Sequence, residues 1–195
     1  MTEINDLNHE DDRLEWDDYF MQLAEFVKER STCFRRKVGA VAVDRRHRVI
    51  GTGYNGAPAG MSHCTRKSCI REKLKIPSGQ RSELCKAIHA EENIVLQLGE
   101  KLEGATLYCT IQPCIMCTKS LIGAGIHRIV WKGDYPDDYA RELMLEYGTH
   151  RVLPNGYHEL LEHGKWAVVD GYRMPFHRKN NGISVKRIRD LVLIN

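Results

Sequence analysis

Apolar side chains follow two spacings along this chain, one typical of helices and one typical of strands. Within residues 14–30 the apolar side chains recur with the period of a helix, which predicts a helix packed on a sheet. Residues 38–43 and 48–53 flank a polar turn, which predicts the two strands of a hairpin. The same patterns predict a helix that ends at Gly99, strands over 105–111, 126–131 and 166–170, and helices over 113–124, 137–147 and 183–191. This order is typical of a three-layer α/β/α domain, in which helices cover both faces of one mixed central sheet.

Residues 54–84 interrupt this regular pattern. They begin within GYNGAPAG, a stretch of loop-forming residues, and then show little periodicity. A loop of this length inside a compact domain is normally functional or is held in place by something. We therefore expect this segment to take part in a site.

The composition is that of a soluble globular protein of about one domain. The chain has 195 residues, of which 42% are apolar and 28% are charged. No apolar run approaches the length of a membrane span, and the acidic start of the chain lacks the apolar core of a secretory signal. We expect a cytoplasmic protein that does not contact a membrane.

The net charge of +3 hides an uneven distribution. Residues 1–18 hold eight acidic side chains and one arginine, whereas residues 165–195 hold seven basic side chains and two aspartates. This asymmetry predicts an acidic, flexible start over 1–13, a catalytic domain over 14–152, and a basic extension over 153–195 that packs on that domain or extends it.

Two short motifs carry metal chemistry. The first is His89-Ala90-Glu91, and the second places Cys114 and Cys117 three residues apart at an expected helix start, after Pro113. Two thiolates and one imidazole are three ligands of a catalytic zinc, which keeps one position for water. Both His89 and Glu91 face such a metal only if His89 lies at or just before a helix start. Glu91 then moves protons and is not a ligand. The simpler alternative is two core thiols and an ordinary helix-start histidine.

Together the motifs form H-x-E…P-C-x-x-C, the signature of the zinc deaminases. Further stretches resemble the deoxycytidylate (dCMP) deaminases over about residues 14–152: STCFRRKVGAVAV, GTGYNGAPAG, HAEEN, GATLYCT and QPCIMC. The resemblance implies a cytidine-deaminase-like fold and zinc-dependent hydrolysis of dCMP to dUMP and ammonia, which feeds thymidylate synthesis. It also implies that Glu91 takes a proton from water, passes it to N3 of the base, and protonates the leaving amine.

The resemblance further suggests which residues hold the nucleotide. Asn55 is similar to the asparagine that holds the deoxyribose, the backbone of Ala90 would contact the base, and Tyr135 stands where the family often has an aromatic side chain near the nucleotide. The 5′-phosphate needs cationic or amide donors. The sequence does not choose among the candidates for that role, Arg35, Arg36 and Lys37.

Many members of this family are also regulated. The resemblance implies a homohexamer with a second site between subunits, where dCTP activates and dTTP inhibits, with Mg²⁺ on the triphosphate. Gly53, Asn55 and Gly56 lie where that pocket would be. One departure from the family is Glu92, a charge beside Glu91 that we expect to face outward.

Five further cysteines remain outside the signature. Cys109 lies in an expected strand and is most simply a buried small apolar residue. The other four resemble a pattern in bacterial and phage dCMP deaminases that bind a second, structural zinc: Cys33, Cys64, Cys69 and Cys85. Four thiolates would close a tetrahedral site and order the long loop. His63 replacing one cysteine, unligated thiols, and disulfides are the alternatives.

Three other functions compete with dCMP deamination. The substrate could be another cytosine nucleotide or nucleoside, such as dCTP or deoxycytidine, because only the phosphate pocket would differ. A single-stranded nucleic-acid deaminase or binding protein could use the basic tail, although the GYNG loop favours a mononucleotide. A regulatory protein without catalysis would not need the complete set of His89, Glu91, Cys114 and Cys117.

Overall fold

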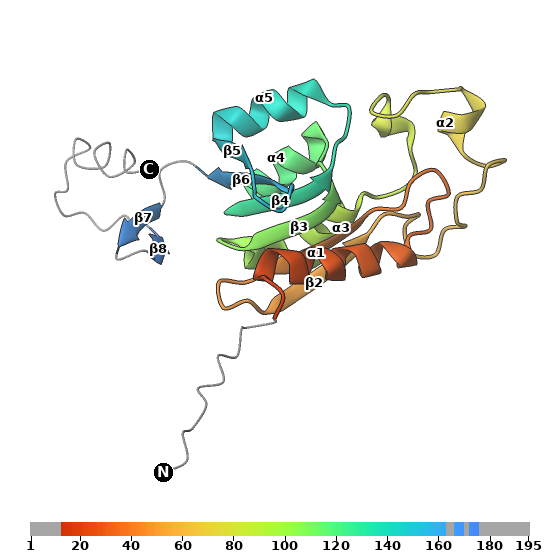
Figure 1. Cartoon of the computed structure of the whole chain (residues 1–195). Helices are drawn as coiled ribbons and strands as arrows, with labels where there is room; N and C mark the ends of the chain where they lie inside the picture. Colours follow the sequence, from red (N-terminus) through yellow and green to blue (C-terminus); the bar gives the residue numbers. More distant parts are fainter. Residues whose placement is uncertain (1–12, 163–165, 170–171, 176–195) are drawn as a thin grey trace, which may run out of the picture.

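The structure of this chain is a computed structural model, and it describes residues 13–162, 166–169 and 172–175 (Figure 1). Six strands form one sheet in the order β2-β1-β3-β4-β6-β5. Their bounds are β1 Gly39–Val43, β2 Val49–Tyr54, β3 Thr106–Ile111, β4 Arg128–Gly133, β5 Gly148–Val152 and β6 His158–Glu162. The sheet is mixed, because β3 and β4 run parallel while the other neighbours are antiparallel. A separate antiparallel pair joins β7 (Trp166–Val169) to β8 (Tyr172–Pro175).

Helices cover both faces of the six-stranded sheet, as Figure 1 shows. One face is covered by α1 (Trp16–Val27), and the other by α3 (Ala90–Leu98), α4 (Ile115–Gly123) and α5 (Asp138–Tyr147). The expected three-layer α/β/α architecture is therefore confirmed. The remaining short helices are α2 (Ile70–Lys73) and the 3₁₀ turns Lys28–Arg30, Ser82–Leu84 and Gly99–Leu102. No helix in the described ranges is both long and apolar enough to cross a membrane.

Strand β1 shows why the sheet has a core on each side. All five of its residues are buried, and successive side chains point to opposite faces of the sheet. The small side chains of Ala40 and Ala42 pack in the core formed with α3, α4 and α5. The larger side chains of Val41 and Val43 pack with Phe20 of α1. The strand is thus an apolar run rather than an alternating one because both its faces are covered.

A partly buried ionic network joins α1 to strands β4, β6 and β5 of the sheet that it covers. Both guanidinium Nη atoms of Arg128, on β4, donate to the Asp17 carboxylate at 2.6 Å. The Nε atom of Arg128 pairs with Glu159 of β6, whose side chain is 1% exposed and also binds Arg151 of β5. Burial alone would raise the pKa of Asp17, but the hydrogen bonds and charge of Arg128 hold it below its usual value of 3.8. The network fixes α1 and the β5–β6 hairpin to the same central strand.

Most of the expected elements are present within a few residues of their predicted bounds. The β5–β6 hairpin was not predicted, and it crosses the expected boundary at residue 152, so the sheet continues into the extension. The division of the chain at that residue stays a prediction. The strand expected over 166–170 is present as β7, whereas the helix expected over 183–191 lies outside the described residues.

Candidate active site

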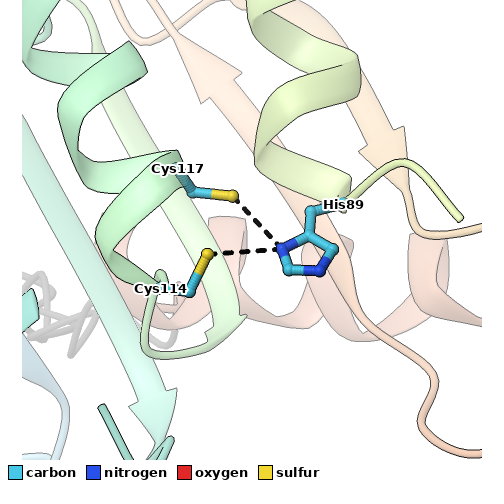
Figure 2. A group of neighbouring side chains, drawn as sticks. All are labelled: His89, Cys114 and Cys117. Atoms are coloured by element: carbon cyan, nitrogen blue, oxygen red, sulfur yellow. Dashed lines mark hydrogen bonds between the residues drawn. The ribbon is translucent and has the colours of Figure 1, made fainter. Parts of the chain in front are cut away.

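Three metal-ligating side chains meet between the starts of α3 and α4. His89 is the residue just before α3, with extended backbone, and Cys114 has the same place before α4. The Nδ1 atom of His89 lies 3.5 Å from Sγ of Cys114 and 3.3 Å from Sγ of Cys117 (Figure 2). Within the described residues, no other group of three or more such side chains has all its ligand atoms within 4.8 Å of one another. The position expected for His89 is confirmed.

The chemistry of this donor set fits zinc. Its members are one imidazole and two thiols, the two cysteines are buried, and three protein ligands are the number that catalytic zinc sites use. The hydrogen bond from Cys117 and the neighbouring His89 lower the pKa of the Cys114 thiol, and the hydrogen bonds with Cys114 raise the pKa of Cys117 and of His89. These contacts favour the thiolate at Cys114, which is the form in which cysteine binds metal.

Glu91 lies beside these ligands, in the first turn of α3. Its side chain is 3% exposed, and burial raises the pKa of its carboxyl group. The thiol of Cys109, on β3, forms a hydrogen bond with Glu91 and is itself fully buried. Cys109 is thus a buried core residue of a strand, as expected, and its thiol also neighbours the group expected to move protons. The sequence held no signal for this contact, which depends on how β3 packs against α3.

A pocket of about 210 Å³ opens onto these groups. Its wall is formed by the approach to β1, the segment between β2 and α3, the start of α3, the end of β3 and the turn after β4. Among the described residues that line it, Glu91 is the only one with a carboxylate. Of the expected nucleotide contacts, the pocket brings together Arg35, Arg36, Asn55, Ala90 and Tyr135.

Asn55 fixes the wall of the pocket through its own side chain. Its Oδ1 accepts hydrogen bonds from the Val38 backbone N–H at 2.8 Å and from the Ser31 hydroxyl at 2.6 Å. Its Nδ2 donates to the Arg36 carbonyl at 2.8 Å. An amide nitrogen has two hydrogens. The second N–H of this amide has no protein acceptor among the described residues.

Two arginines line the pocket with donors that lack a partner. Arg35 contacts Glu72 at 3.2 Å and the Ile76 carbonyl at 3.0 Å, but its buried Nη1 has no hydrogen-bond partner in the described part of the chain. Arg71, on α2, donates from Nη2 to the Pro77 carbonyl at 2.9 Å, and its buried Nε has no partner among the described residues either. Arg71 was not predicted, since its segment shows no periodicity and no motif marks it.

The other two phosphate candidates lie differently. Arg36 lines the pocket, with its guanidinium 5.9 Å from the centre of the buried Tyr135 ring. Lys37 is an exposed residue that pairs with Glu29, and it does not line the pocket. The structure therefore favours Arg35 over Lys37 as a ligand contact.

Four further cysteines surround the same pocket. Cys33, Cys64, Cys69 and Cys85 all line it, and Cys64 and Cys69 are buried. Burial raises the pKa of the Cys64 thiol, and the electrostatic influence of the other three sulfurs adds to this rise. No three of these described sulfurs lie within 4.8 Å of one another. The four side chains expected to hold a second metal therefore line one pocket, but their sulfur atoms lie farther apart than the ligand atoms of the His89 site.

The glycines expected near an effector pocket have a packing role. A Cβ atom on Gly53 would lie 2.2 Å from the Ala90 carbonyl oxygen, and one on Gly56 would lie 2.2 Å from the Thr32 hydroxyl. Both positions need glycine so that the end of β2 approaches α3 and residue 32 closely. Glu92 is exposed, as expected.

Comparison with known proteins agrees with this geometry. The chain is 40% identical over 136 residues to the deoxycytidylate deaminase of Schizosaccharomyces pombe, covering 69% of this chain and 42% of that protein. It is 44% identical over 125 residues to the deoxycytidylate deaminase of Mycobacterium phage D29, covering 61% of this chain and 95% of that protein. The chain thus spans about two fifths of the length of the fission yeast relative and nearly all of the phage relative.

Solved structures show the same fold. The apo dCMP deaminase of the cyanophage S-TIM5 aligns with a TM-score of 0.52 at 25% identity, over 67% of this chain and 94% of that one. The same enzyme in complex with dCMP and dUMP aligns with a TM-score of 0.54 at 23% identity, over 69% and 93%. The sequence profile of the cytidine and deoxycytidylate deaminase zinc-binding region matches residues 14–132. The chain therefore belongs to the cytidine and deoxycytidylate deaminase family.

Proposed function

We propose that this protein hydrolyses dCMP to dUMP and ammonia in the pocket around Glu91. The observation that carries the proposal is a zinc-type ligand set next to one pocket that holds a buried carboxylate and two arginines, each with a donor that has no partner among the described residues. The relatives from fission yeast and phage D29 are named deoxycytidylate deaminases, which supports the same substrate.

His89, Cys114 and Cys117 are the residues that would hold zinc. When bound, zinc lowers the pKa of water so that a nucleophile forms near neutral pH. The donor set contains two sulfurs and one nitrogen, and the family profile that the chain matches describes a zinc-binding region. None of the three side chains has another role in the proposed reaction.

Glu91 moves the protons of the reaction. Its carboxylate takes a proton from the attacking water and passes it to N3 of the cytosine ring. The oxygen of water bonds to C4 as a hydroxyl group. Glu91 then takes the remaining proton of this hydroxyl and gives it to the amino group, and the C4–N bond breaks to leave a C4 carbonyl and ammonia. A raised pKa suits this role, because a carboxyl group that both accepts and donates works best when its pKa lies near the working pH.

Arg35 and Arg71 bind the 5′-phosphate in this proposal. Each offers a buried N–H that has no partner within the described ranges, and leaving such a donor unpaired costs free energy that an anionic ligand recovers. Charge-assisted hydrogen bonds to phosphate are about twice as strong as neutral ones. The two arginines therefore favour a nucleotide over a nucleoside.

The remaining pocket residues orient the base and the sugar. The free N–H of Asn55 is suited to the deoxyribose, the Ala90 backbone to the base, and the Tyr135 ring, held by Arg36, to the nucleotide face. These contacts rest on the family resemblance and on the shared pocket. They position the substrate and do not take part in proton transfer.

A second, structural zinc on Cys33, Cys64, Cys69 and Cys85 belongs to the same proposal. The four sulfurs line one pocket, and a metal would need to draw them closer than they stand here. Such a metal would fix the wall that carries Arg71, since that residue follows Cys69 by two positions.

Regulation and assembly follow from the family resemblance alone. We predict a homohexamer that dCTP activates and dTTP inhibits, with Mg²⁺ on the bound triphosphate and with Gly53, Asn55 and Gly56 close to the effector. Activity that is hyperbolic in dCMP and insensitive to both triphosphates would contradict this prediction.

Ammonia release from a panel of substrates tests the proposed function. The zinc-loaded protein is assayed with dCMP, dCTP, deoxycytidine, CMP and single-stranded DNA at equal concentrations of cytosine. A clear preference for dCMP is the expected result. A preference for deoxycytidine would remove the phosphate role of the arginines, and activity on DNA alone would move the substrate site away from this pocket.

A further inference from the structure

Two histidines meet at the end of the sheet opposite to β2, outside the pocket around Glu91. His150 lies on β5 and His158 on β6, which pair so that Leu160 faces His150 and Val152 faces His158. The two histidines are therefore diagonal neighbours on one face of the hairpin. The Nε2 atom of His150 lies 3.1 Å from the Nδ1 atom of His158.

The indole of Trp131 holds both imidazole rings in place. The His150 ring lies 5.2 Å from the indole centre at an angle of 11°, and the His158 ring lies 5.4 Å away at 10°. Trp131 is 2% exposed, so this platform is rigid. Both rings are thus oriented before anything binds between them.

Without a metal, the two facing nitrogens share a hydrogen bond, in which one ring donates and the other accepts. A neutral imidazole can carry its proton on either nitrogen, so a metal ion can bind both facing nitrogens once the donor ring holds its proton on its other nitrogen. The carboxylate of Asp134, which follows β4, lies 4.0 Å from the other nitrogen of His158, Nε2. A carboxylate that moves within hydrogen-bond distance of that nitrogen is the usual outer partner of a metal-binding histidine. Burial lowers the pKa of His150, and the charges of His158 and Arg141 lower it further, which favours the neutral ring that binds metal.

We propose that His150 Nε2 and His158 Nδ1 together bind a divalent first-row transition metal ion such as Ni²⁺ or Zn²⁺. Two nitrogens that each lie about 2.1 Å from one ion at an angle between roughly 90° and 109° are separated by about 3.0 to 3.4 Å, which includes the observed spacing. Imidazole suits these ions, and water completes the coordination. The site opens into a cavity of about 330 Å³, which leaves space for that water.

The nearest positive charge is held away from the facing nitrogens. Arg141, on α5, also lines this cavity. Its Nε donates to Oε1 of the buried Gln112 at 3.1 Å, and its Nη2 lies 3.3 Å from Asp134. Arg141 therefore faces Asp134 and Gln112, and the Asp134 charge offsets part of its repulsion toward a bound cation.

Ni²⁺ titration of the full, zinc-loaded chain tests this proposal. Loading with zinc, followed by dialysis that removes weakly held ions, keeps the thiol sites occupied and leaves the two-histidine site empty. The exposed His150 can be replaced without removing core packing. Because even outer partners of a metal site are worth about tenfold in affinity, we expect His150→Asn and His158→Asn each to weaken Ni²⁺ binding by at least roughly tenfold. Asp134→Asn should weaken it by less than either.

The matched control is His47→Asn, which removes a histidine from the exposed turn between β1 and β2. It should bind Ni²⁺ as the unaltered chain does. Broadening of the His150 and His158 ring-proton signals by substoichiometric paramagnetic Ni²⁺ is a second expected result. Unchanged Ni²⁺ affinity in His150→Asn, or no broadening of these two rings, would overturn the proposal and leave an ordinary hydrogen bond between the imidazoles. Neither readout depends on deaminase activity.

Discussion

Replacing Arg71 with glutamine separates binding of a phosphate from the rest of the proposed reaction. Arg71 is 8% exposed and lines the same pocket as Glu91. It has one buried N–H without a partner among the described residues. A hydrogen bond to a charged group contributes about 1.5 to 3 kcal/mol. Since about 1.4 kcal/mol changes a rate tenfold, we expect Arg71→Gln to lower kcat/KM for dCMP by about 10- to 150-fold.

The assay compares dCMP with deoxycytidine, which has no phosphate. Arg71→Gln also removes the hydrogen bond to Pro77, so a general loosening of the loop would slow both substrates. Loss of a phosphate contact slows dCMP alone. Lys73→Gln is the matched control, because Lys73 is an exposed residue of the same short helix and does not line the pocket. Equal losses for both substrates, or no loss for dCMP, would refute the assignment of Arg71.

Three further results are expected from the fold and its metal content. Arg128→Met should lower the free energy of unfolding by about 3 kcal/mol, because it removes the cation that Asp17 of α1 and the buried Glu159 share, whereas Lys132→Met at an exposed ion pair should cost less than about 1 kcal/mol in denaturant titrations. Because the folded pKa of Asp17 lies below 3.8, its stabilising contribution is complete above its unfolded pKa of about 3.9 and is lost as the pH falls through the lower folded value. Asp17→Asn should flatten the fall in stability over that acidic range, and an unchanged profile would contradict the linkage. After dialysis that removes weakly held ions from the two-histidine site, metal analysis should find two zinc ions per chain and one in Cys64→Ser; one ion in the unaltered chain would rule out the structural site.

Local sequence signals identified the metal ligands because their spacing constrains the backbone. The single residue between His89 and Glu91 places both side chains on one site only when the helix starts at Ala90, which is where α3 begins. Likewise, a separation of three residues is enough to place Cys114 and Cys117 on one side of a helix start. Such constraints act over a few residues and can be read without knowing the tertiary structure.

Long-range packing created what the sequence did not reveal. The β5 strand has the polar, mostly exposed pattern of an edge strand and gives little periodic signal. Its place is set instead by pairing with β6 and by the contact of Arg151 with Glu159. Arg71 and Cys109 reach the site from an aperiodic loop and from an apolar strand, and only the packing of these segments around α3 gives them a role.

The most direct test of the central claim compares the unaltered chain with Glu91→Gln at equal zinc content. The substitution keeps the size of the side chain and removes the only carboxylate among the described residues of the pocket. Zinc per chain, ammonia and dUMP are measured from dCMP. We predict that the unaltered chain forms ammonia and dUMP in equal amounts, and that Glu91→Gln retains zinc but reacts about 10²- to 10⁴-fold more slowly. Unaltered turnover in Glu91→Gln would contradict the account.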